Sequence, residues 1–388
     1  IASGISMFFL VKEFFGKSAA LVASIIYLYF PYHAVNIYVR GDLAELAAYS
    51  FLPLVFLALF KIHGSDKISK HYIVLGSISI AAVVLSHNLS AFMLFIFSGA
   101  FIAYSLISKN NRKVLASSYF SILTLAFLLS AFYAVPAVVQ AKNTNIMSVV
   151  GGGSNPLDHF VCPGQLWDSP WGFGGSAKGC IDGISFKLGK ANILLTVLGM
   201  VLAIFSFLKL KEKKEIVFVS AGFLLFSLFM TLEFSSFLWG APYMDFLQFP
   251  WRFLNFVGLF VSIIVGFLVW RIGELLGDKV KIIIITVIII ITIITNVKLF
   301  APQKILDRDA SYYTNSYYLN WTASKISDEY LPKSFVKPKS PADIEGLKQR
   351  YGMFDFRQTP IEQISNALSL IGAFALLLVI IGYGKKAS

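Results

Sequence analysis

The sequence predicts an all-α polytopic membrane protein. Of the 388 residues, 57% are hydrophobic and 14% are charged, whereas soluble domains have roughly 45–50% and about 25%. So few charged groups cannot cover the surface of a soluble fold of this length. The net charge of +12 comes from short Lys and Arg clusters between apolar runs, which is typical of membrane orientation and not of nucleic-acid binding. Composition therefore excludes a soluble enzyme, a disordered chain and a collagen-like fibre.

The apolar runs predict about eleven transmembrane helices, because a span needs about 20 mostly apolar residues. The runs cover about 2–15, 18–37, 43–61, 71–87, 89–108, 114–139, 191–209, 215–233, 251–271, 280–299 and 361–383. The stretch 282–294 is apolar all round, so we expect it to face lipid. The chain begins at Ile1, already inside an apolar run, and we expect an N-terminal truncation that leaves the first run incomplete.

Three regions follow from these runs. We expect residues 1–299 to form a membrane domain of ten spans that contains an outer loop at 140–190. Residues 300–360 then form a small extracytoplasmic segment, and residues 361–383 form the last transmembrane helix.

Lys and Arg residues in alternate short connections predict the orientation of the spans. The basic set is expected to be cytoplasmic, and it lies near residues 12–17, 61–70, 109–113, 209–214, 271–281 and 385–386. The other set is expected to face outside, and it comprises 38–42, 86–89, 140–190, 234–250 and 300–360. We therefore expect a multi-pass protein of the plasma (cytoplasmic) membrane, in contact with the lipid bilayer, whose candidate site lies on the outer face.

The first outer connection places an arginine beside a helix start. Asp42 and, three residues later, Glu45 form a capping-box pattern. One interpretation is a plain helix start with Arg40 as an interfacial anchor. The other is that Arg40 holds a phosphate, because an Arg beside a helix N-terminus is a natural anion site, while Glu45 orients Arg40 or accepts a proton.

Two further outer turns carry polar side chains. His87 and Asn88 lie in a tight turn between two spans, where they bind phosphate or shuttle a proton, or else form only a solvated turn. Gln248, Trp251 and Arg252 stand at the start of another span. An arginine at that position either snorkels to the interface or faces a cavity, where it binds the phosphate or pyrophosphate of a lipid.

The loop 140–190 combines aromatic, glycine and acidic residues. Trp171 begins a Trp-Gly-Phe-Gly-Gly-Ser run, with Asp158 before it and Asp182 after it. Indole faces stack on sugars and carboxylates accept hydroxyl hydrogen bonds, so the loop predicts a sugar site; the alternative is an interfacial segment anchored by Trp. Cys162 and Cys180 lie 18 positions apart on the expected oxidising side, which favours a disulfide over two free thiols.

The segment 300–360 contains weaker signals. Asp307 and Asp309 form a D-x-D triplet, which some sugar transferases use for a metal; a divalent metal stays an open alternative, and no other cofactor is expected. Glu329 is a candidate acid or base. The sequence contains no P-loop, dinucleotide glycine pattern, HExxH motif or serine elbow.

The outer-face segments together resemble one family. The matching residues are Pro31-Tyr32 with Tyr38-Val39-Arg40-Gly41 and Glu45, Ser86-His87-Asn88, Trp171-Gly172-Phe173-Gly174-Gly175-Ser176, Asp182-Gly183 with Ser185-Phe186, Gln248-Phe249-Pro250-Trp251-Arg252, and Glu329-Tyr330-Leu331-Pro332. They resemble the bacterial and archaeal membrane proteins labelled "6-pyruvoyl-tetrahydropterin synthase related", which look like members of the GT-C glycosyltransferase superfamily. The resemblance implies a GT-C-like bundle with extracytoplasmic loops and a catalytic carboxylate on a first outer loop, upstream of Ile1. Pterin chemistry does not follow, because the sequence lacks the histidine cluster of a soluble pterin synthase.

These observations predict a membrane glycosyltransferase of cell-envelope glycan or glycolipid synthesis. The resemblance implies a polyprenyl-phosphate-linked sugar as donor and a saccharide or lipid as acceptor. The candidate catalytic carboxylates in this chain are Glu45, Asp158, Asp182 and Glu329, and cationic groups would stabilise the leaving phosphate. The alternatives are a transporter or flippase of a lipid-linked saccharide, which needs polar groups along a path through the membrane, and a non-catalytic envelope-assembly protein.

Overall fold

The structure is a computed structural model that describes residues 1–146, 154–210, 213–322, 331–335, 338–351 and 358–384. These residues are helical and form no sheet. Eight helical segments of the described chain are long and apolar enough to cross a membrane. They are built on α3 (Leu43–His63), α5 (Asn88–Ser108), α6 (Arg112–Gln140), α8 (Lys190–Ser206), α9 (Lys213–Thr231), α11 (Leu254–Leu276), α12 (Asp278–Asn296) and α15 (Pro360–Gly384). Each coincides with one of the predicted runs.

The other three predicted runs are helical but less regular. The run 71–87 is α4 (Lys70–Ser86), which is apolar but only 17 residues long. The runs 2–15 and 18–37 begin in α1 (Ala2–Leu28), which is interrupted at Gly16 with φ 84° and ψ 172°, a conformation that favours glycine. A Cβ atom at Gly4 would lie 3.6 Å from the carbonyl oxygen of Ser24, so the two halves of α1 fold back on each other as a hairpin.

The second half of α1 does not continue unbroken to residue 37, as the sequence predicted. It ends at Leu28, and a new short helix, α2 (Pro31–Ala34), begins at a proline, whose fixed φ suits a first helical position. A π-helical turn, Val35–Val39, follows and ends at Arg40. This irregular stretch brings Asn36 and Arg40 to the same side of the chain, four positions apart.

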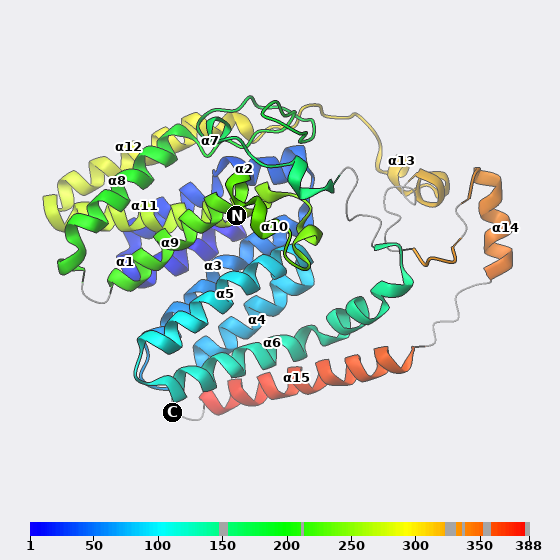
Figure 1. The fold of residues 1–388 in the computed structure, drawn as a ribbon, viewed down its shortest axis with the longest axis horizontal. Coiled ribbons are helices and arrows are strands. Elements are labelled where there is room, and N and C mark those ends of the chain that lie inside the picture. Colours follow the sequence, from blue (N-terminus) through cyan, green and yellow to red (C-terminus); the bar gives the residue numbers. More distant parts are fainter. Residues whose placement is uncertain (147–153, 211–212, 323–330, 336–337, 352–357, 385–388) are drawn as a thin grey trace.

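The bundle is organised around α11, which is almost wholly buried. Helices α1, α8 and α9 pack directly against it, while α12 lies at the periphery with half of its isoleucines exposed, as expected for 282–294. In Figure 1, α3 to α6 form a second group beside this one, and α15 lies along α6 at the edge. Buried aromatic side chains fill the space between α3, α5, α9 and α11.

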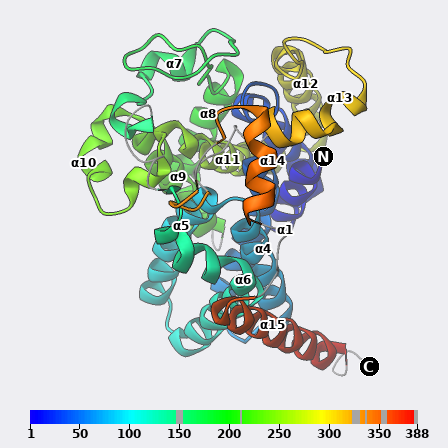
Figure 2. The ribbon, with the colours of Figure 1, turned by 90° about the vertical axis from the view of Figure 1, so that its right-hand side faces the viewer.

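The two ends of the bundle differ in chemistry. At one end, which we call the basic end, residues from the predicted cytoplasmic connections line one cavity, among them Lys61, Lys109 and Arg271. At the opposite end, which we call the loop end, Arg40 and Arg252 come together. Figure 2 looks toward the side of the molecule that carries α13 (Ala310–Thr314) and α14 (Pro341–Tyr351), with α7 (Pro163–Trp167) at the top. The described residues of 300–360 are mostly exposed.

Candidate functional site at the loop end

Two helix starts at the loop end supply the charged residues of the candidate site. Asp42 is the N-cap of α3, and its Oδ1 accepts a hydrogen bond of 2.9 Å from the backbone N–H of Glu45, the first half of the predicted capping box. Arg252 lies in a 3₁₀ turn, Pro250–Phe253, that leads into α11. We call Arg40, Asp42, Glu45, His87 and Arg252 the arginine cluster.

Glu45 is the centre of the arginine cluster. Its side chain is completely buried, and both carboxylate oxygens accept hydrogen bonds. Oε1 accepts from Tyr32 Oη at 3.0 Å, Asn36 Nδ2 at 3.3 Å and Asn255 Nδ2 at 2.6 Å, and Oε2 accepts from Arg40 Nη1 at 2.8 Å and Arg252 Nη1 at 3.0 Å. A buried carboxylate needs this degree of pairing to stay charged. The geometry therefore favours Glu45 as the group that orients the arginines over a proton acceptor open to a substrate.

Arg40 is held on several sides but remains partly exposed. Its Nη2 donates to Asp42 Oδ2 at 2.6 Å, and its Nη1 donates to Asn36 Oδ1 at 2.6 Å. The guanidinium lies 4.8 Å from the ring centre of Trp251, within cation–π range. Burial alone would lower the pKa of Arg40, but the neighbouring tyrosine and the two carboxylates raise it above its ordinary value. Arg40 is therefore a permanent cation at the loop end of the bundle.

The side chain of Arg252 is more buried than that of Arg40, and one of its N–H donors has no hydrogen-bond acceptor among the described residues. Its Nη2 donates to Gln248 Oε1 at 3.1 Å, and Gln248 adopts a positive φ of 62°, which is uncommon for a residue other than glycine. The Nε of Arg252 is buried and has no hydrogen-bond partner among the described residues. A buried donor without a partner costs free energy, so this atom marks a place where an acceptor from a ligand would be favourable.

His87 completes the cluster from the turn between α4 and α5. Its Nδ1 lies 3.2 Å from the backbone N of Ser90 and 2.8 Å from the Ser90 hydroxyl, and its Nε2 lies 3.3 Å from Arg252 Nη1. Two neutral forms of the His87 ring fit these contacts. In one form Nδ1 accepts from the Ser90 N–H and the proton is on Nε2. In the other form Nδ1–H donates to the Ser90 hydroxyl, and Nε2 accepts from Arg252. Burial is the main cause that lowers the pKa of His87; Glu45 opposes this shift and Arg252 adds to it.

The loop 154–189 reaches the arginine cluster through Trp251. The indole Nε1 donates to Ser176 Oγ at 3.2 Å, and the same hydroxyl lies 2.8 Å from His159 Nδ1. Trp251 also stacks on Phe249, with ring centres 4.7 Å apart. Ser176 thus ties the Trp/Gly segment of the loop to the ring that covers Arg40.

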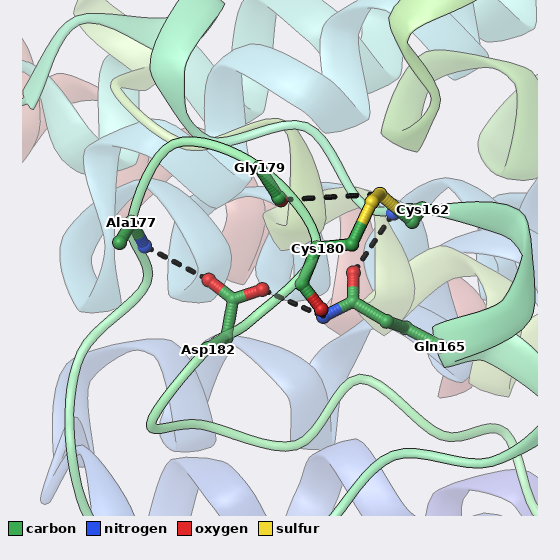
Figure 3. Close-up of a disulfide and its surroundings, with 6 residues drawn as sticks. All are labelled: Cys162, Gln165, Ala177, Gly179, Cys180 and Asp182. Carbon is green, nitrogen blue, oxygen red and sulfur yellow. Dashed lines mark hydrogen bonds between the residues drawn. A yellow bond between two sulfur atoms is a disulfide. The ribbon is translucent and has the colours of Figure 1, made fainter.

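A disulfide between Cys162 and Cys180 closes this loop (Figure 3). Gln165 connects the two sides, since its Nε2 donates to the Cys180 carbonyl at 3.2 Å and to Asp182 Oδ2 at 2.6 Å (Figure 3). The other oxygen of Asp182 accepts from Ala177 N at 2.8 Å. Asp182 is therefore engaged in holding the loop together.

The remaining predicted site residues lie apart from the cluster. Asp158 pairs with Lys178 at 3.2 Å, and Asn88 Nδ2 donates to Tyr133 Oη at 2.9 Å on the surface. Trp171 contacts Phe173 within the loop. Glu329 lies outside the described residues.

Sequence reasoning missed the neutral donors on Glu45, including Asn36 and Asn255. Asn255 lies inside the most apolar part of a predicted span, where a polar side chain marks a bundle interior or a cavity. That signal could have found it, because almost every neighbour of Asn255 in α11 is apolar. The signal for Asn36 is weaker, since 29–42 contains many polar residues.

The arginine cluster also contains three groups with the spacing of metal ligands. Atoms of Asp42, Glu45 and His87 lie within 4.8 Å of one another. Both oxygens of Glu45 already accept hydrogen bonds, and two guanidinium groups lie within 3.0 Å of one of them. A divalent cation would have to displace these positive charges, so the donor set does not fit a metal, and we derive no step through one.

Comparison with known proteins identifies the N-terminal part of the chain. Residues 1–158 match the model of a family described as "6-pyruvoyl-tetrahydropterin synthase related domain; membrane protein". This match shows what residues 1–158 are similar to. The matched residues include Arg40, Glu45 and His87, while Arg252 lies beyond the end of the match. The resemblance stated from the sequence is confirmed over residues 1–158, and the chain is a multi-pass integral membrane protein. No curated protein and no solved structure matches the chain.

Proposed function

We propose that this chain acts as a membrane glycosyltransferase that takes a sugar from a polyprenyl phosphate at the extracytoplasmic face, with a GT-C-like arrangement of about eleven spans. The observation that carries the proposal is the convergence of Arg40 and Arg252 on the buried carboxylate of Glu45 at the loop end. Glu45 and Arg252 are 207 positions apart in the sequence. Charged groups inside a membrane bundle are costly to bury, so such a cluster marks a candidate functional site.

Phosphate is the ligand chemistry that suits these arginines. A guanidinium offers a planar fork of donors that matches two phosphate oxygens. Arg40 is partly exposed, and the buried Nε of Arg252 has no acceptor among the described residues. His87 can add a donor from its Nε2 on the same side. In this proposal these three groups hold the phosphate and stabilise the charge that develops when the sugar leaves.

The loop end also offers a place for an isoprenoid tail. An apolar cavity of about 520 Å³ is lined by Leu28, Ile37, Leu43, Leu46 and Phe300, among others. Ile37 and Leu43 flank Arg40 in the sequence, and Leu46 follows Glu45, so this cavity uses the neighbouring faces of the same elements. A lipid phosphate seated at Arg40 would therefore have an apolar surface beside it.

Within this proposal, the buried Glu45 is a positioning residue. Its two oxygens hold the guanidinium groups at 2.8 and 3.0 Å, and they are not free to take a proton from an acceptor hydroxyl. Asp158 and Asp182 keep their contacts within the loop. The acceptor saccharide or lipid approaches from the Trp251 side, where the disulfide-closed loop meets the cluster.

Reconstituted vesicles test the proposal with the full chain. A radiolabelled polyprenyl-phosphate sugar is supplied, and both glycosidic product and movement of donor across the bilayer are measured. We expect product formation that falls at least tenfold in Arg252→Ala, the loss expected when charge-assisted contacts are removed. Arg308→Ala, at an exposed arginine stacked on Tyr312, is the matched control and should retain activity.

Three results would overturn the proposal. An undiminished rate in Arg252→Ala removes this residue from the reaction. Donor that crosses the bilayer with no new glycosidic bond favours the transporter or flippase, and neither product nor crossing favours the non-catalytic assembly protein.

A further inference from the structure

The basic end of the bundle contains a cavity of about 1010 Å³, far larger than the one beside Arg40. We propose that this cavity binds the phosphate group of an anionic ligand on the face opposite the arginine cluster. The proposal does not depend on the transferase activity. The lining residues come from α1 just before its interruption at Gly16, from the ends of α3, α9 and α11, and from the connections beside them.

The charge of the lining favours an anion. The lining contains six basic and four acidic side chains. The basic residues are Lys61, Lys109, Lys209, Lys213, Lys214 and Arg271, and the acidic residues are Glu13, Asp66, Glu215 and Glu274. The surplus is two positive charges, close to the charge of about −1.5 to −2 that a phosphate monoester carries at neutral pH.

Two of the acidic groups already have cationic partners in the walls. Glu13 accepts from Lys61 Nζ at 2.6 Å. Glu215 Oε2 lies 2.8 Å from Lys109 Nζ and 2.9 Å from His63 Nε2. His63 is buried, and its Nδ1 lies 2.8 Å from the hydroxyl of Ser105 on α5. These links join α3, α5 and α9 and give the cavity a fixed wall.

Arg271 and Lys213 are held in position by neutral groups and form no ion pair among the described residues. Arg271 Nε donates to Ser206 Oγ at 3.0 Å, and its two terminal nitrogens have no acceptor within the part of the chain that the structure describes. Lys213 Nζ lies 5.0 Å from the ring centre of Trp270. Both side chains are therefore held at the cavity by neutral groups, which leaves their charge available to a ligand.

A scattered basic surface would also arise from membrane orientation alone. The cavity differs from such a surface because Arg271 and Lys213 line the same concave space as buried His63 and its partner Glu215, which is partly exposed. The head group of an anionic lipid and a free phosphate compound offer the same phosphate chemistry to this cavity. The experiment below separates the two sources.

The test uses the purified full chain in nanodiscs. The probes are phosphatidic acid in phosphatidylcholine, and inorganic phosphate added to phosphatidylcholine alone; binding is followed by native mass spectrometry and by the thermal unfolding midpoint. We expect one of these probes to bind and to raise the midpoint. A response to phosphatidic acid alone identifies a lipid head group, and a response to inorganic phosphate identifies a soluble source.

Matched variants locate the binding. Arg271→Gln and, separately, Lys213→Gln should weaken the binding by about tenfold, the loss of one charge-assisted contact. Arg112→Gln, at the start of α6 and outside the cavity lining, should leave it unchanged. If Arg271→Gln does not fold, Arg271→Lys replaces it in the binding measurement. Equal loss in Arg112→Gln and the cavity variants, or no response of the wild type to either probe, overturns the proposal.

Discussion

Replacing Glu45 by glutamine removes the one charge that both arginines of the loop end share. The change is nearly isosteric, so packing is preserved and the effect is electrostatic. Arg40 and Arg252 donate to the same oxygen at 2.8 and 3.0 Å, and that oxygen is fully buried. Glutamine leaves the two guanidinium groups with only Asp42 as a negative partner in the cluster.

The expected loss of unfolding free energy is about 3–5 kcal/mol, because removing one partner of a buried ion pair leaves the other charge buried without compensation. The matched control is Glu13→Gln, because Glu13 pairs with Lys61 but is 41% exposed, and exposed pairs contribute about 0–1 kcal/mol. Reversible unfolding in mixed micelles, followed by tryptophan fluorescence, measures both variants. A loss in Glu45→Gln no larger than in Glu13→Gln would refute the reasoning that Glu45 holds the cluster together.

Three further predictions concern other parts of the chain. Gly372→Leu should cost about 1–3 kcal/mol by overpacking, because a Cβ at Gly372 already meets the α6 backbone at 2.9 Å; Gly99→Leu, in open space, should cost less in the same unfolding assay. Because burial lowers the pKa of His87, the unfolded chain binds its proton more readily, so stability should fall as pH drops below about 6.5; His87→Gln should flatten this part of a stability–pH profile. Loss of the Cys162–Cys180 bond, by serine substitution, should cost about 3 kcal/mol for an 18-residue separation, and added reductant should then have no effect on the unfolding midpoint.

Much of the membrane architecture could be predicted because it depends on the local sequence. Apolar runs of sufficient length dictate helices in a bilayer, and eight of the predicted runs are such helices. The break at residues 29–30 was missed, because Pro31 lies in a run that is apolar on average. Mean hydropathy over a window does not register a single helix start.

The cluster was only partly predictable, for a different reason. Counting spans places Arg40 and Arg252 on the same side, and the capping pattern at Asp42 predicts how α3 begins. The burial of Glu45 depends on how α11 docks against the start of α3, a tertiary contact that no local pattern encodes. For the same reason the sequence predicted Asp182 only as a candidate catalytic carboxylate, whereas both of its oxygens accept hydrogen bonds within the loop.

In the proposed function, Arg40 and Arg252 act together on one phosphate. A double-mutant cycle for binding of a polyprenyl phosphate to the full chain tests this most directly, with Arg40→Lys, Arg252→Lys and the double variant. Lysine keeps each charge but loses the planar fork. We predict that each single variant weakens binding and that the double variant departs from additivity by about 1 kcal/mol or more. Additive losses, or no loss in either single variant, would show that the two arginines do not share a ligand.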